Sequence, residues 1–553
     1  MNLNYVRLAL YGLLFLLAFI LFNLWQKEHP SQVLASARTS ILAPEETPAG
    51  MKVENATLPS SSPVMGMTTP TLVSNDLVQI KTDVIDATID LKGGNLIKVQ
   101  LPAYPESLQA PHRPYQLLSF EPDSLYIAQS GIRSVIPPHV PVSYRTTQSH
   151  FELMPGQNAL KVVLQGRNAQ GIDFTKTYTF ARQRYVISVE VVANNVSSQA
   201  WDGQAYEQLL RKKAETKTGI TSAFLFNPFI GAAYSTQDHP YQKINFKKMA
   251  SSNLDLTTNQ GWVAMLEHYF LSAWIPTAGE KVQLYTQTED NLYSIGMLST
   301  PQHIMPGQKM TQQATLYAGP LITHDLKSIA PHLDLTVDYG WLWIISEALF
   351  WLLNKIHSVI GNWGWSIVMV TILVKALFYR LSASSYRSMA AMRAIQPKIQ
   401  ALRERYGDDK QKLSQAMMEI YRKEKVNPLG GCLPMLVQIP VFLALYWVLF
   451  ASVELRQAPF ILWIRDLSTP DPYYVLPILM GLSMLIQQKL SPPPPDPTQA
   501  KVMMLMPLVL TLFFLNFPAG LVLYWVVNNT LSILQQVYIT RRLSKHTVKT
   551  PRG

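Results

Sequence analysis

The stretch from Asn362 to Ser382 constrains this chain most, because it is long and apolar enough to cross a lipid bilayer. One charged side chain, Lys375, interrupts it near the end that leads into a basic segment. A lysine at the centre of a membrane helix costs about 2.5–3.5 kcal/mol on insertion scales. Lys375 must therefore be hydrated, be paired, or extend to the lipid headgroups.

Helical spacing gives this stretch one polar and one apolar face. The polar face carries Thr371, Lys375, Tyr379 and Ser382. In one interpretation the lysine simply snorkels to the membrane surface. In the other, the polar face lines a water-filled cavity inside the membrane.

A second polar stripe lies on the last apolar stretch, residues 519–539. One helical face of it carries Tyr524, Asn528, Ser532 and Gln535, with Trp525, Asn529 and Gln536 beside them. An earlier apolar stretch adds Gln438. Amides without partners in hydrocarbon cost several kcal/mol each, so these faces should point inward. They act either as interhelical bonds, which contribute about 0.6 kcal/mol each, or as the wall of a hydrated groove. The presence of Lys375 on a neighbouring polar face favours the groove.

The whole chain is expected to cross the membrane six times. The apolar stretches are residues 5–24, 362–382, 429–451, 473–490, 500–515 and 519–539. Residues 1–28 resemble a signal sequence, but the cleavage-like Ala35-Ser36-Ala37 lies well past the apolar run, which favours an uncleaved anchor. The net charge of +11 gathers beside these stretches, above all in 381–427 and 541–553, as in loops on the inner side of a membrane. Both termini would then lie inside.

Residues 77–335 have the alternating pattern of β-strands. Apolar residues recur every second position in 85–91 and 97–101, on either side of Lys92-Gly93-Gly94-Asn95, which predicts a hairpin. The same alternation recurs in 172–180 and 185–191. Many short strands separated by Gly, Pro and Asn predict an antiparallel β-sandwich on the outer side.

The segments between these domains have their own signatures. Residues 29–76 are rich in Ser, Thr, Pro and Ala and are predicted to be a flexible linker. Residues 336–358 combine several tryptophans with a polar stripe, which is typical of a helix lying on the membrane surface. Residues 381–427 predict a basic helical hairpin with an apolar seam, inside the core domain 359–540. Residues 541–553 form a short basic tail.

Nothing in the sequence predicts catalysis. The single cysteine, Cys432, excludes an intramolecular disulfide and a Cys/His metal site. The histidines of the outer domain are scattered, and no GxxxxGK[ST] motif is present. We therefore expect no catalytic residues, no cofactor and no metal, and the placement of the basic residues argues against nucleic-acid recognition.

Several motifs resemble the YidC membrane-protein insertase family. They are Gln396-Pro397-Lys398-Ile399-Gln400, Lys425-Val426-Asn427-Pro428-Leu429-Gly430-Gly431-Cys432, Gln438-Ile439-Pro440-Val441-Phe442, 453–460 (VELRQAPF) and 517–525 (FPAGLVLYW). The match is highly specific from Trp363 to Arg541 and looser through the outer domain. The order of anchor, strand-rich domain, surface helix and five-helix core resembles the Gram-negative form.

This resemblance implies a polytopic α-helical membrane protein with six transmembrane helices and a β-supersandwich-like periplasmic domain in the bacterial inner membrane. It implies an insertase and chaperone, not an enzyme, with a hydrophilic groove open to the cytoplasm. Lys375 falls where the family carries its groove cation, commonly Arg, and Thr371 lies one turn earlier. Trp525 replaces the second tyrosine of an aromatic pair. The expected partners are nascent membrane proteins, the Sec translocon, ribosomes or targeting factors at the hairpin, and lipids.

Two other functions remain as alternatives. A small-solute transporter would show internal repeats and a midplane site in broken helices, and no repeat is seen. An anchored sugar-acting enzyme would need paired carboxylates in a cleft of the outer domain. The predicted groove comprises Lys375, Thr371, Gln438, Tyr524, Trp525, Asn528, Ser532 and Gln535.

Overall fold

The computed structural model describes residues 76–213, 228–407, 409–424, 426, 433–491 and 497–547. The predicted first span, and the predicted linker up to residue 75, lie outside these residues. The chain divides into two compact units, residues 1–64 with 394–426, and residues 65–393 with 427–553. Each unit is described by itself.

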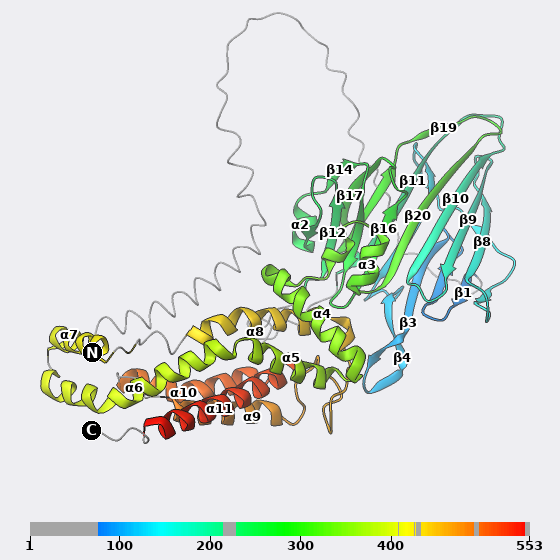
Figure 1. Cartoon of the computed structure of the whole chain (residues 1–553). Coiled ribbons are helices and arrows are strands. Elements are labelled where there is room, and N and C mark those ends of the chain that lie inside the picture. Colours follow the sequence, from blue (N-terminus) through cyan, green and yellow to red (C-terminus); the bar gives the residue numbers. More distant parts are fainter. Residues whose placement is uncertain are drawn as a thin grey trace, which may run out of the picture. The chain divides into compact units, whose positions relative to one another are not determined.

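The strand-rich region forms two sheets packed face to face (Figure 1). One has the order β14-β17-β18-β11-β5-β3-β2-β1-β7, with β19 paired to β11 and β4 to β3; the other has the order β13-β12-β15-β16-β20-β10-β9-β8-β6. Neighbouring strands are antiparallel, apart from β1 and β7. The predicted antiparallel sandwich is therefore confirmed.

The strands have the following bounds. In the first sheet they are β1 (Leu77–Lys81), β2 (Asp86–Asp90), β3 (Asn95–Ser107), β4 (Ala110–Leu118), β5 (Tyr126–Ser134), β7 (His150–Glu152), β11 (Trp201–Lys212), β14 (Asp255–Thr258), β17 (Val282–Glu289), β18 (Leu292–Ser299) and β19 (Gln302–Ile304). In the second they are β6 (Tyr144–Arg145), β8 (Ala159–Arg167), β9 (Ile172–Ala181), β10 (Val186–Asn195), β12 (Gly231–Thr236), β13 (Gln242–Ile244), β15 (Gly261–Leu266), β16 (Phe270–Pro276) and β20 (Lys309–Pro320).

The alternation in the sequence explains the core of the sandwich. Along β9, Ile172, Phe174, Tyr178 and Phe180 are buried while their neighbours are half-buried. The predicted hairpin is the β2–β3 pair, and its turn contains Gly93 and Gly94 at positive φ, a conformation that favours glycine. The two sheets thus close over one large apolar core.

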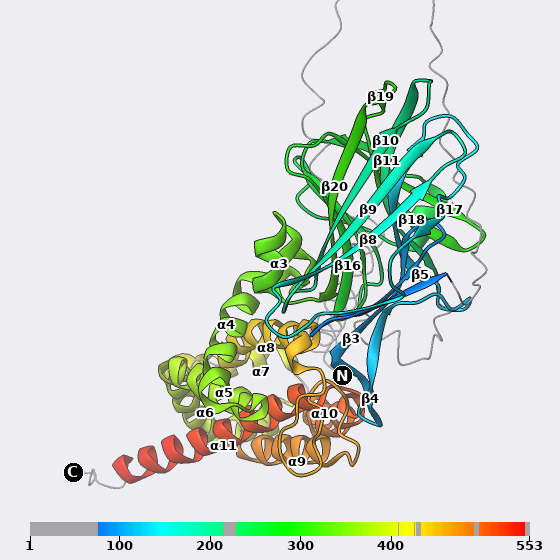
Figure 2. The same ribbon diagram turned by 90° about the vertical axis from the view of Figure 1, so that its right-hand side faces the viewer.

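Short helices accompany the sandwich, and longer ones follow it (Figures 1 and 2). The short ones are α2 (Phe246–Ser251), α3 (Thr323–Ile329) and the 3₁₀ turns Leu333–Thr336 and Gly340–Leu342. The longer ones are α4 (Trp343–Ile360), α5 (Trp363–Leu377), α6 (Tyr379–Tyr406), α7 (Lys410–Lys423), α8 (Leu433–Ala451), α9 (Val475–Leu490), α10 (Pro497–Phe514) and α11 (Ala519–Thr547). A further 3₁₀ turn, Val453–Leu455, follows α8.

Helix α4 is amphipathic, as its sequence predicts. Ser346, Leu349 and Leu353 are buried, and the Ser346 hydroxyl donates to the Ala444 carbonyl of α8 at 3.1 Å. Trp343 and Trp351 are exposed. In the helical hairpin α6–α7, Ile399 and Met417 are buried along the predicted seam.

The expected continuous helix from 362 to 382 is wrong. Among the described residues, no single helix combines the length and apolarity that a membrane crossing needs, whereas α5 and α6 meet that test together, with a 67° bend between them. The bend falls at Phe378, whose N–H bonds to the carbonyls of Val374 and Ala376. Neither proline nor glycine occurs at this position, so the local sequence did not predict the bend.

Candidate functional site

Lys375 lies on the last turn of α5, where a positive charge interacts favourably with the helix dipole. Its side chain is buried, with 3% of its surface exposed. Nζ donates to Ser532 Oγ of α11 at 2.7 Å, and Ser532 Oγ donates to the Asn528 carbonyl at 2.8 Å. The ammonium is therefore held between two helices.

A cavity of about 360 Å³ opens beside this lysine. Its lining comes from α5, α6 and α11 and consists of Ile372, Lys375, Ala376, Tyr379, Leu531 and Gln535. The Gln535 side-chain oxygen has no hydrogen-bond partner among the described residues. The walls thus combine aliphatic side chains with an ammonium, an amide and a phenol as polar groups.

The charge of Lys375 has no counter-ion within the described part of the chain. None of the ion pairs found there includes it, and its nearest partner is a neutral hydroxyl. A buried charge without a partner of opposite sign is costly. A substrate carboxylate or carbonyl that enters the cavity would therefore be strongly attracted to the Lys375 ammonium.

Other predicted groove residues make contacts elsewhere. Thr371 is buried, and its hydroxyl donates to the Ile367 carbonyl at 2.7 Å, within its own helix. Gln438 on α8 and Asn528 on α11 are half-buried and do not line the cavity. Of the eight predicted residues, Lys375 and Gln535 line it, and Ser532 binds the ammonium.

The two predicted aromatic residues pack inside the helical region. Tyr524 stacks on Phe442 of α8, with 6.2 Å between ring centroids. Trp525 meets the same ring edge-on at 4.5 Å and Phe514 of α10 at 5.2 Å. In this structure these two rings join α8, α10 and α11.

Asn529 and Gln536 act as interhelical bonds. Asn529 Nδ2 donates to Ser483 Oγ of α9 at 3.0 Å, and Gln536 Nε2 donates to the Leu490 carbonyl at 2.9 Å. All three side chains are buried. Asn529 and Gln536 of α11 therefore bind α9, while Gln535, the residue before Gln536, lines the cavity.

Sequence reasoning missed the apolar walls and Ser483. Ile372, Ala376 and Leu531 line the cavity but carry no chemical signal, since aliphatic residues are expected throughout such helices. Their positions next to Lys375 and Gln535 on the helical wheel were the available clue.

Two family patterns match the chain. Residues 77–352 match the family described as "YidC periplasmic domain", and residues 355–546 match "60Kd inner membrane protein". The chain is 48% identical over 549 residues to "Membrane protein insertase YidC" of Legionella pneumophila (strain Lens), covering 97% of each chain. It is 46% identical over 562 residues to the same-named protein of Coxiella burnetii (strain Dugway 5J108-111), covering 98% of this chain and 97% of the relative.

An "Active YidC insertase crystal structure with the first transmembrane domain resolved" is 17% identical, with a TM-score of 0.38, over 84% of this chain and 92% of that one. The assignment depends on the two sequence relatives, which are 48% and 46% identical over nearly the whole chain. This chain therefore belongs to the YidC family of membrane protein insertases.

Proposed function

We propose that this protein inserts and folds proteins of the bacterial inner membrane, alone and together with the Sec translocon. The polar part of a substrate enters the cavity beside Lys375 from the cytoplasmic side, and its apolar segments then pass into the lipid along α5 and α11. The observation that carries this proposal is the buried ammonium of Lys375, which no carboxylate of the described residues neutralises, beside an open cavity.

The electrostatics suit a transient contact. At an effective dielectric near 20, a carboxylate about 8 Å from Nζ gains roughly 2 kcal/mol. That attraction is enough to bias a passing acidic segment toward the cavity and too weak to trap it. The Ser532 hydroxyl holds the ammonium in place between encounters.

The proposed topology has six membrane crossings, with the first in residues 5–24 and both termini in the cytoplasm. The β-sandwich then lies in the periplasm. Helix α4 rests on the periplasmic surface of the inner membrane through exposed Trp343 and Trp351. The basic hairpin α6–α7 faces the cytoplasm, where it meets ribosomes or targeting factors.

No nucleotide motif is present in the sequence. The driving free energy therefore comes from burial of the substrate's apolar segments in lipid, at about 25 cal/mol per Å². The role is that of a chaperone that lowers the cost of carrying polar peptide into the membrane, without a catalytic step.

Site-specific photo-crosslinking during synthesis of a small membrane protein tests this function. The crosslinker replaces Gln535 in the cavity, and a matched control replaces Met504, an exposed residue of α10. We expect adducts to the nascent chain from position 535 and mainly lipid adducts from position 504. Lipid adducts alone from both positions would count against insertion through this cavity.

A further inference from the structure

The loop between α8 and α9 has an apolar tip, formed by Ile461 and Leu462. Two backbone bonds close the turn, from the Phe460 N–H to the Ile464 carbonyl at 2.9 Å and from the Ile464 N–H to the Ile461 carbonyl at 3.1 Å. Ile461 is 42% exposed and Leu462 is 79% exposed. Leu462 has a φ of 54°, in the left-handed region that is unfavourable for a residue with a Cβ. The loop thus holds two adjacent aliphatic side chains outward at a conformational cost.

The rest of this loop is packed. Ile464 and Leu467 are buried. The buried carboxylate of Asp466 accepts from the Gln457 N–H at 3.0 Å and from the Ser468 N–H at 2.8 Å. Backbone N–H groups bonded to one carboxylate in this way fix the loop conformation. The exposure of the tip is therefore a property of an ordered loop.

The tip is attached to the first turn of α5. Asn362 Nδ2 donates to the Phe460 carbonyl at 3.1 Å, while Asn362 Oδ1 accepts from the Trp365 N–H at 3.1 Å and so caps the helix. The Phe460 ring lies against Gly364, where a Cβ would come within 2.0 Å of it. The same ring meets the Trp365 ring edge-on, with 5.4 Å between centroids. The tip, which follows Phe460 directly, therefore lies beside the first turn of α5.

The exposed apolar surface of the tip continues along α5. Trp365, Met369 and Leu373 are exposed, and their spacing of four residues places them on one face of the helix. Continuous exposed apolar surfaces of this kind mark contact with a partner or a membrane. In a family of membrane proteins, this face of α5 is one that lipid covers.

The same surface extends from the tip to α9. Trp463, next to Leu462, donates through Nε1 to Asp471 at 2.9 Å and meets the Tyr473 ring edge-on at 6.3 Å. Tyr473 and Tyr474 are exposed at the start of α9, and tyrosine and tryptophan are enriched where a membrane meets water. The exposed apolar residues that follow on α9 are Ile478, Leu479, Leu482, Leu485 and Ile486. A protein partner on the tip would have to displace lipid from these adjoining faces, so the surface favours lipid itself.

One positive charge lies next to the tip. Arg465 is exposed and follows Leu462 by three residues. The neighbouring carboxylate of Asp466 is engaged by backbone N–H groups inside the loop. A guanidinium matches the geometry of a phosphate, with which it forms paired hydrogen bonds. An apolar tip beside an exposed guanidinium therefore matches a phospholipid, which offers acyl chains and a phosphate.

We propose that this loop inserts Ile461 and Leu462 into the lipid leaflet at the N-terminal end of α5 and binds the phosphate of an anionic phospholipid through Arg465. Through Phe460 the tip then joins the lipid to the first turn of the helix that carries Lys375. This contact does not depend on whether a substrate passes through the cavity beside Lys375, and so it goes beyond the function proposed above.

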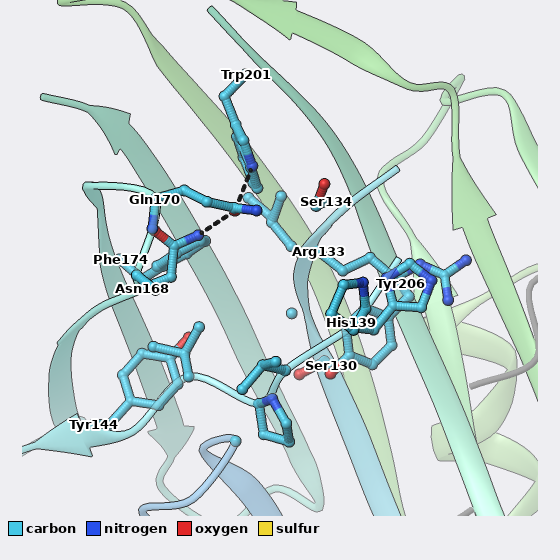
Figure 3. Close-up of a pocket in the computed structure, with 18 residues that line it drawn as sticks. Ser130, Arg133, Ser134, His139, Tyr144, Asn168, Gln170, Phe174, Trp201 and Tyr206 are labelled. Carbon is cyan, nitrogen blue, oxygen red and sulfur yellow. Dashed lines mark hydrogen bonds between the residues drawn. The ribbon is translucent and has the colours of Figure 1, made fainter. Parts of the chain in front are cut away.

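Spin labelling of the full-length protein in vesicles of phosphatidylethanolamine and phosphatidylglycerol tests the insertion of the tip. Cys432, the single cysteine of the chain, is replaced by serine, and Leu462→Cys then carries the nitroxide. The control is Val140→Cys, because Val140 is 74% exposed beside a cavity of about 220 Å³ in the β-sandwich (Figure 3).

We expect oxygen, which concentrates in lipid, to relax the label at position 462 more strongly than a water-soluble nickel chelate does, with the opposite order at position 140. Stronger relaxation by the nickel chelate at position 462 would place the tip in water. Protection of that label from both reagents would place it beneath a protein partner. Either result would overturn the proposal.

A benzophenone side chain in place of Leu462 tests the phospholipid headgroup. The vesicles contain equal amounts of phosphatidylglycerol and phosphatidylcholine with the same acyl chains. We expect adducts to both lipids, with phosphatidylglycerol favoured by about fivefold, the effect of one arginine near an anionic lipid surface. Arg465→Gln should remove this preference, whereas Arg145→Gln, which changes an exposed arginine of β6, should retain it. Equal labelling of the two lipids, or a preference that survives Arg465→Gln, would refute the role of Arg465.

Discussion

Lys375 Nζ and Ser532 Oγ lie 2.7 Å apart and join the last turn of α5 to α11. The contact holds a buried ammonium by a neutral hydroxyl, which leaves its charge uncompensated. A cation that is fixed but unneutralised is suited to attract an acidic segment without a competing carboxylate.

Replacing Lys375 by alanine should reduce insertion of a membrane protein with an acidic outer segment by up to about 30-fold, the equivalent of roughly 2 kcal/mol of lost attraction. Lys375→Arg should retain most of the activity, because the charge is kept. The measurement is the insertion rate into vesicles that contain each variant. Equal loss in both variants, or a larger loss for Arg, would contradict the electrostatic explanation.

Lys375→Met should raise thermal stability while lowering insertion. Replacing a buried charge by an apolar side chain of similar volume is often neutral or stabilising, by about 1–4 kcal/mol. Lys489→Met, at the exposed end of α9, is the matched control and should change stability by less than about 0.5 kcal/mol. A clear loss of stability in Lys375→Met would show that the ammonium is part of the packing and not a functional charge.

The amides of α11 show what the sequence could and could not predict. Helical spacing correctly placed polar residues on the buried side of this helix, but it gives only angles within one helix. It does not say that Asn529 meets Ser483 while Gln535 faces the cavity, since that depends on how α5, α9 and α11 surround each other. The predicted stripe therefore mixed residues that bind a neighbouring helix with residues that line the cavity.

The sandwich was easier to predict than the helices. A period of two marks a half-buried strand directly, and Gly93-Gly94 marks its turn. The loop before α9 was not predictable in the same way. Asp471 of this loop is 1% exposed and accepts from Trp463 Nε1 and the Leu476 N–H. Such capping depends on a loop conformation that periodicity does not describe.

The Asn529–Ser483 bond should contribute little to stability and nothing to insertion. Asn529→Ala, Ser483→Ala and the double variant form a thermodynamic cycle. Interhelical hydrogen bonds of this kind average about 0.6 kcal/mol, with a maximum near 1.7. We expect a coupling energy in that range from unfolding in detergent, with normal insertion rates in all three variants. A severe insertion defect in Asn529→Ala alone would assign this amide to the substrate path.

The contact of His268 with α8 should make stability depend on pH. His268 lies between β15 and β16, and its Nε2 is 2.9 Å from the carbonyl oxygen of Phe450. Burial lowers the pKa of this imidazole to about 4, against an ordinary value near 6.5. The folded protein thus keeps the ring neutral in a range where the unfolded chain binds a proton.

The contribution of His268 to stability is therefore complete above pH 6.5 and is lost as the pH falls from 6.5 toward 4. The loss is at most about 3.4 kcal/mol, at 1.36 kcal/mol per pKa unit. Over this range the unfolding temperature of the unmodified protein should fall relative to that of His268→Gln, because glutamine can donate to the same carbonyl without titrating. His303, which is exposed beside Asp202, provides the control in His303→Gln, whose difference from the unmodified protein should not follow this curve. Parallel pH profiles for the unmodified protein and His268→Gln would show that protonation of this ring is not coupled to unfolding.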